Sequence, residues 1–143
     1  MNNLKKEFVL YGEALELKEL GFDEPCFGWF NTNNNDSLAL CDLFGFLNEL
    51  TIRDFHKNSI DDKVSAPTFS QAFRWFRENF GLFSSEVYDR GLDNGKLPII
   101  HSYSFRILNL NNFKDFYGDT FKTYEEAELA CLKKLIEIVK QEQ

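Results

Sequence analysis

Few side chains in this sequence have the types and spacing that metal binding requires. Oxygen-bearing residues recur at Asn31, Asn33, Asn35 and Asp42, in the pattern by which an EF-hand loop presents calcium ligands at its first, third, fifth and twelfth positions. However, Asp36 stands where that loop needs its turn glycine, and the twelfth position lacks a glutamate. We therefore interpret the segment as the loop of a β-hairpin.

The two histidines, His56 and His101, share no short ligand spacing with each other or with a cysteine. Structural zinc sites usually combine four such ligands at short intervals. The three cysteines, Cys26, Cys41 and Cys131, are an odd number and form no close pair, which is typical of buried thiols in a reducing compartment. We predict no metal site and no cofactor.

Two pairs of carboxylates could serve in acid-base catalysis, Asp61 with Asp62 and Glu125 with Glu128. Nothing in the sequence indicates that either pair is desolvated. Glu128 lies close to the apolar arc of its expected helix, and we interpret it as facing water near the helix start, where the dipole favours it. The residue types for a Ser-His-Asp or Cys-His arrangement are present, but no nucleophile elbow accompanies them. The prediction is a protein that is not an enzyme.

The composition indicates one folded domain, residues 1–143. Hydrophobic residues make up 43% of the chain and charged residues 27%, and the 16 phenylalanines supply large burial per residue. No apolar run approaches the length of a membrane span, and the start of the chain is polar. A cytoplasmic protein is the expectation.

Negative charge is concentrated in the first part of the chain. Residues 1–64 hold 6 Lys/Arg against 12 Asp/Glu, while residues 65–143 hold 10 against 11. Such a surface repels nucleic-acid phosphate and attracts basic partners. Solubility alone is the simpler explanation for this charge.

The first 64 residues predict a helix followed by a hairpin. Apolar residues recur at helical spacing over residues 11–20, and Gly21 followed by Phe22 is typical of a Schellman cap. Residues 26–30 and 37–41 then predict two strands joined by the polar loop 31–36. For residues 42–64 helix and strand signals conflict, and no structure is assigned.

Residues 65–143 predict the order helix, three strands, helix. Thr68 with Gln71 and Thr123 with Glu126 have capping-box spacing at the two helix starts, and Gly81 ends the first helix. The expected extended segments are residues 84–88, 97–110 and 115–121, with a loop at 89–96. The whole chain is therefore predicted to be α+β, an antiparallel sheet packed against about three helices.

This C-terminal order resembles the topology of the double-stranded-RNA-binding domain. That family places lysines at the start of its last helix to hold phosphates, whereas this chain has Glu125 and Glu126 there. The likeness is therefore one of topology, not of charge.

Four stretches of the sequence, residues 17–26, 65–67, 71–78 and 123–138, resemble small uncharacterised proteins of Bacteroidota genomes and their phages. The resemblance brings no established activity and no catalytic residues, and it does not extend to residues 31–64. It implies a mobile-element context, in which small acidic proteins often bind host factors.

Three functions follow as hypotheses, of which one alternative is an enzyme acting on a small substrate, in a concave pocket with convergent polar groups. The first is a protein-binding module of phage or mobile-element type that occludes a basic surface, such as that of a host nucleic-acid-targeting defence complex. Its expected contact residues are acidic: Glu13, Glu16, Glu19, Asp23 and Glu24. The other alternative is a nucleic-acid-binding domain that uses Arg74 and Arg77, with Trp75 stacking on a base.

Overall fold

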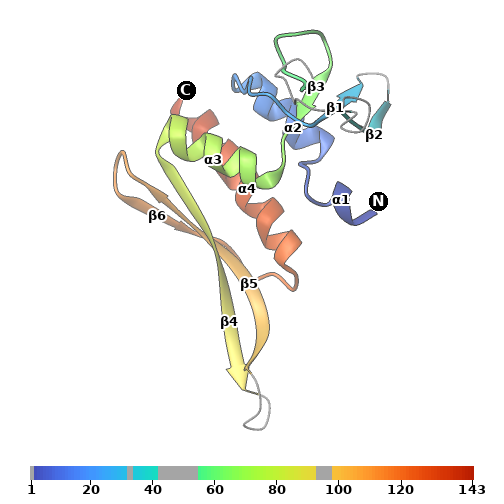
Figure 1. Ribbon diagram of the computed structural model, residues 1–143. Helices are drawn as coiled ribbons and strands as arrows, with labels where there is room; N and C mark the ends of the chain where they lie inside the picture. The colour runs from blue at the N-terminus through green and yellow to red at the C-terminus, as the bar shows by residue number, and fades with distance from the viewer. Residues whose placement is uncertain (1, 32–33, 42–54, 93–97) are drawn as a thin grey trace, which may run out of the picture. The chain divides into compact units, whose positions relative to one another are not determined.

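The computed structural model describes residues 2–31, 34–41, 55–92 and 98–143 (Figure 1). The chain is α+β, as predicted, and divides into two compact units, residues 1–72 and 73–143. The strands form two three-stranded antiparallel sheets, one in each unit. The prediction of a single antiparallel sheet is wrong in this respect.

The N-terminal unit contains two helices and a small sheet. The helices are α1 (Asn2–Lys5) and α2 (Tyr11–Glu19), and the strands are β1 (Gly28–Asn31), β2 (Asn34–Leu40) and β3 (Val64–Ala66), in the order β2-β1-β3. The predicted hairpin is confirmed, although β2 begins three residues earlier than expected. Strand β3 was not predicted, because a run of three consecutive buried residues is too short to show a strand period.

Helix α2 ends as predicted, in a Schellman cap. The amide of Phe22 donates to the carbonyl of Leu17 at 2.9 Å, and that of Gly21 to the carbonyl of Lys18 at 3.1 Å. Gly21 has a φ of 98°, which glycine adopts without strain. Phe22 is thereby folded into the core, where it is fully buried.

The C-terminal unit has the predicted order of elements. Helix α3 (Phe69–Phe80) begins in the first unit and continues into the second, where β4 (Leu82–Leu92), β5 (Pro98–Asn109), β6 (Lys114–Tyr117) and α4 (Tyr124–Glu142) follow (Figure 1). The expected loop at 89–96 is wrong at its start, because β4 continues its pairing with β5 to Leu92. The last strand is shorter than expected, and Phe121 makes a single bridge to Tyr103.

Helix α4 covers one face of this sheet and contacts β4 and β5. The Thr123 hydroxyl accepts from the Glu126 amide at 3.2 Å, so the predicted N-cap is confirmed. The Glu126 carboxylate accepts from the Lys122 amide rather than from Thr123. The buried residues of α4 all lie on the apolar arc: Ala127, Cys131, Leu132, Leu135, Ile136, Ile138 and Val139.

Gly12 within α2 and Gly21 in its C-terminal cap allow the Schellman cap to be tested. We expect Gly21→Ala to lower the free energy of unfolding by about 1–2 kcal/mol, because a Cβ disfavours the positive φ. Gly12→Ala, inside the helix with open space around its Cα, should instead stabilise by up to about 1 kcal/mol. Urea unfolding measures both. Equal effects of the two substitutions would contradict the cap.

Candidate functional site

The five acidic residues expected to bind a partner do not all lie on the surface. Glu13 is only 8% exposed, because it lies on the buried face of α2 with Ala14 and Leu17. The prediction that Glu13 belongs to an exposed acidic surface is therefore wrong. Glu19 is exposed, and Glu16, Asp23 and Glu24 are half-buried. The segment between Phe55 and Val64 adds two further carboxylates to the same unit.

Residues 56–63 form a surface loop, called here the acidic loop after Asp61 and Asp62; it also carries Lys57 and Lys63, so its formal charge is zero with His56 neutral. Its first residue is fixed by a bridge in which His56 and Cys26 exchange backbone hydrogen bonds of 2.8 and 2.9 Å. Its last residue leads into β3. Within it the amide of Ile60 donates to the carbonyl of Lys57 at 3.1 Å, which closes a turn.

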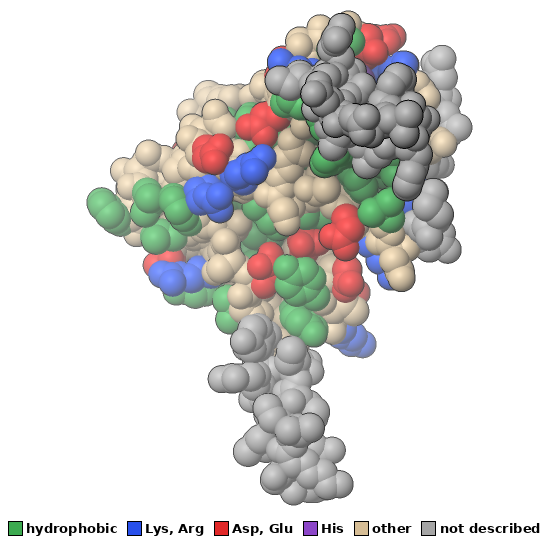
Figure 2. Space-filling view, viewed as in Figure 1, with side chains coloured by type: hydrophobic (Ala, Val, Ile, Leu, Met, Phe, Trp, Pro, Cys, Tyr) green, Lys and Arg blue, Asp and Glu red, His purple; other side chains and the backbone are tan. Residues whose placement is uncertain are grey.

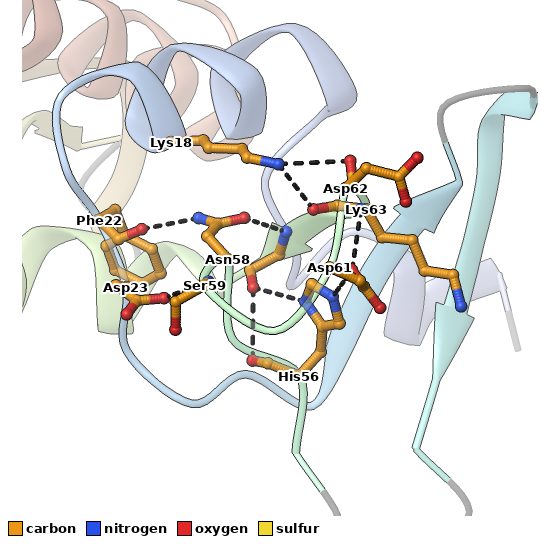
Figure 3. A network of polar contacts seen from close by, with 10 residues as sticks. Lys18, Phe22, Asp23, His56, Asn58, Ser59, Asp61, Asp62 and Lys63 are labelled. Carbon is orange, nitrogen blue, oxygen red and sulfur yellow. Dashed lines mark hydrogen bonds and ion pairs between the residues drawn. The ribbon is translucent and has the colours of Figure 1, made fainter.

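The end of α2 and its cap hold this loop from one side (Figure 3). The Asn58 side chain donates to the carbonyl of Phe22 at 2.7 Å, and the amide of Ser59 donates to the Asp23 carboxylate at 2.7 Å. The ammonium group of Lys18 reaches the carbonyls of Asp62 and Lys63, at 3.3 and 3.0 Å. The helix therefore positions the loop through its backbone.

His56 holds the loop from the other side. Its Nε2 lies 2.9 Å from Asp61 Oδ1, its Nδ1 lies 2.7 Å from Ser65 Oγ, and its ring stacks on Trp29. The Ser65 hydroxyl also donates to the backbone carbonyl of His56 at 3.3 Å, so both the ring and the backbone of His56 are tied to β3.

These contacts bring together a serine, a histidine and an aspartate, a combination whose residue types the sequence contained without a supporting motif. Ser65 is fully buried in β3, and its own amide donates to the Asn58 side chain at 2.8 Å. An attacking hydroxyl needs access to a substrate carbonyl. The arrangement therefore positions the loop and does not present a nucleophile.

Two aspartates of this network have lowered pKa values. The hydrogen bond from His56 holds the pKa of Asp61 below its usual value, with help from the Lys63 amide, which donates to the same carboxylate at 2.9 Å. Burial acts to raise the pKa of Asp23, but hydrogen bonds from Ser59 and the charge of Lys57 outweigh it and lower the pKa. Both carboxylates therefore stay ionised at neutral pH.

The tip of the acidic loop is apolar. Ile60 is 61% exposed, directly before Asp61 and the exposed Asp62. Figure 2 shows such hydrophobic side chains at the surface beside charged ones. An isolated exposed isoleucine is ordinary, but this one stands on a loop whose backbone is fixed from both sides.

The three residues expected to bind nucleic acid, Arg74, Trp75 and Arg77, differ in their exposure to solvent. Arg74 and Arg77 are exposed on α3, as expected. Trp75 is buried and packs edge-on against Phe76 and Phe80. The expectation that Trp75 stacks on a base is therefore wrong: its position on α3 faces the aromatic core.

The other chemical candidates do not form sites in the described parts of the chain. Asn33 and Asp42 of the calcium-like pattern lie outside the described residues. Of the second carboxylate pair, Glu125 is exposed and Glu128 is half-buried. Glu128 acts on Tyr124: burial raises the pKa of the Tyr124 hydroxyl to about 12, and the charges of Glu86 and Glu128 add to the effect. Among the described residues, no three His, Cys, Asp or Glu side chains are placed to hold a metal ion.

No family of known proteins, no curated protein and no solved structure matches this chain. The resemblances to mobile-element proteins and to the double-stranded-RNA-binding domain therefore stay predictions. None of the helices in the described ranges combines the length and apolar character that crossing a membrane requires.

The charge of Asp61 is testable through pH. Because the folded pKa lies below the ordinary value of 3.8, its contribution to stability is present above that value and is lost as pH falls through the folded pKa. We expect Asp61→Asn to lower the free energy of unfolding by about 1 kcal/mol near pH 7. The effect is modest because the Asp61 side chain is partly exposed and solvent screens its charge. Urea unfolding at pH 7 and at a pH below 3.8 should show a smaller cost at the lower pH.

Asp62→Asn is the matched control, since only the backbone carbonyl of Asp62 takes part in the network. It should leave the free energy of unfolding almost unchanged at both pH values. A cost of Asp61→Asn that does not depend on pH would contradict the ionic role of Asp61.

Proposed function

We propose that this protein is a non-catalytic protein-binding module, which docks the acidic surface of its N-terminal unit on a basic surface of a partner and occludes it. The observation that carries the proposal is the acidic loop, whose backbone is fixed by Lys18, Asn58 and His56 while Ile60 stays exposed. A loop already fixed in one conformation loses little entropy on binding.

The exposed groups define the chemistry of the partner. Asp61 and Asp62 follow Ile60 in the loop, and Asp23 bonds the amide of the preceding residue, Ser59. Glu19 and Glu24 add two further carboxylates near the end of α2, while Lys57 and Lys63 lie in the loop itself. This set suits a partner with a small apolar depression bordered by lysines and arginines. Opposite charges also raise the rate of encounter in a salt-dependent manner.

The resemblance to mobile-element proteins suggests which basic surface is bound. A host defence complex that targets nucleic acids must present positive charge to phosphates. An acidic protein that covers this surface would compete with the nucleic acid. Inhibition of such a complex by occlusion is the form of the proposal that agrees with both the charge and the resemblance.

The two other functions considered from the sequence have less support. A nucleic-acid-binding face on α3 retains Arg74 and Arg77 but lacks the stacking residue, because Trp75 is buried. An enzyme acting on a small substrate gains no support from the Ser65, His56 and Asp61 combination, because the Ser65 side chain is buried as well. We therefore do not propose either.

Charge reversal on the acidic surface is the test of this function. Tagged wild-type protein, incubated with a lysate of the source organism at low salt, should retain a protein partner that mass spectrometry identifies. The triple variant Glu19→Lys/Glu24→Lys/Asp62→Lys should retain at least about tenfold less of it, since each reversal removes a favourable charge from this surface.

The matched control reverses three exposed carboxylates of the C-terminal unit, Glu78→Lys/Asp119→Lys/Glu125→Lys, which changes the net charge by the same amount. It should keep the partner. Equal loss in both variants would show that only net charge matters, and recovery of nucleic acid in place of protein would overturn the proposal.

A further inference from the structure

The C-terminal unit contains a cavity of about 340 Å³ between α4 and the segment that follows β6. Phe105 of β5 lines this cavity and is itself only 5% exposed. Four residues of α4 form one wall: Ala130, Lys133, Lys134 and Glu137. They share one side of the helix, because residues three and four positions apart are neighbours there. Small-molecule sites in proteins begin at about 300 Å³, so the cavity suits a ligand of amino-acid size.

The opposite wall is fixed in place by hydrogen bonds. The Gly118 amide donates to the Phe105 carbonyl at 2.9 Å, and the Ser104 hydroxyl donates to the Gly118 carbonyl at 2.9 Å. A Cβ at Gly118 would overlap the Phe105 ring, so the backbone lies on this ring only because the residue is glycine. Phe121 and Tyr103 exchange backbone hydrogen bonds of 2.7 and 2.9 Å. A cavity whose walls are already fixed loses little entropy when a ligand fills it.

Aromatic rings and one methyl group make up the apolar part of the lining. The rings are those of Phe105, the half-buried Phe121 and Tyr117, which is 71% exposed. Ala130 contributes only a methyl group to the wall of α4, where a longer side chain would fill the space. An aromatic group of a ligand gains contact with these rings and leaves water, which is favourable.

The formal charges of the lining sum to zero. Lys134 Nζ lies 3.0 Å from Glu137 Oε1, so these two charges on α4 neutralise each other. The other two charged groups are Lys133 on α4 and Asp119 on the opposite wall, and both residues are exposed. The cavity therefore presents one cation and one anion from different walls, together with the aromatic rings.

We propose that this cavity binds a small zwitterion with an aromatic body, a free amino acid with an aromatic side chain. Its carboxylate binds the Lys133 ammonium group, and its own ammonium group binds the Asp119 carboxylate. Its ring packs on Phe105 and Phe121. The charges of the ligand thus complement those of the two walls. This inference does not depend on the proposed function, since the acidic loop belongs to the other unit.

Other classes of ligand agree less well with this lining. A purely apolar compound would remove water from Lys133 and Asp119 without replacing its hydrogen bonds, which is unfavourable. A monoanion would be attracted by Lys133 but repelled by Asp119. A nucleotide carries several negative charges and needs a surplus of cations, which a lining of zero net charge does not provide.

NMR of the ¹⁵N-labelled full chain, titrated with L-phenylalanine, tests this inference. The backbone amide signals of Phe105, Gly118 and Phe121 should shift, with a dissociation constant of roughly 1 mM. Two analogues test the charges: 3-phenylpropionate lacks the ammonium group and 2-phenylethylamine lacks the carboxylate. Each should bind about fivefold more weakly. Absence of these shifts up to about 20 mM L-phenylalanine, or equal binding of either analogue, would overturn the proposal.

Variants assign the binding to the cavity. Lys133→Gln and Asp119→Asn should each weaken the binding of L-phenylalanine about fivefold, and Ala130→Leu should abolish it by filling the cavity. Lys140→Gln is the matched control, because Lys140 is an exposed lysine of the same helix outside the lining; it should bind like wild type. If circular dichroism shows Ala130→Leu unfolded, the two polar variants decide. Wild-type affinity in both polar variants would overturn the proposal.

Discussion

The hydrogen-bonding groups of a loop backbone must all find partners, and in this protein that constraint shapes the N-terminal unit. Side chains supply these partners: Lys18 donates to the Lys63 carbonyl at the end of the acidic loop, and Asp23 accepts from the Ser59 amide within it. Asn58, itself in the loop, donates to the carbonyl of Phe22 in the α2 cap. No buried side-chain nitrogen or oxygen in the described part of the chain lacks a partner. The position of Ile60 depends on these bonds, because Ile60 itself is largely exposed.

His56 connects this polar network to the packed core. Its backbone bridges to Cys26, its ring stacks on Trp29, and its two nitrogens contact Ser65 and Asp61. One side chain thus joins β1, β3 and the loop. The geometry resembles a catalytic arrangement in its residue types, but the burial of Ser65 gives it a structural role.

Periodicity and capping residues predicted most of the fold, because those signals are local. The Schellman cap at Gly21, the helix starting after Thr123 and the order of elements after Pro67 all follow from neighbours in sequence. The candidate site was not predictable in this way. The contacts of Asn58 with Phe22 and of Lys18 with Lys63 join residues far apart in the chain. Likewise, the burial of Glu13 and Trp75 depends on which face of each helix meets the core.

The burial of the cysteines has a consequence for the reactivity of this protein. None of the three, all in described ranges, forms a disulfide, and burial raises the pKa of both Cys26 and Cys131 to about 12. At neutral pH only about one in 10⁵ of these thiols is the reactive thiolate. Alkylating or oxidising reagents should therefore modify the half-buried Cys41 first, which makes this position of the native chain the natural place for a single spectroscopic label.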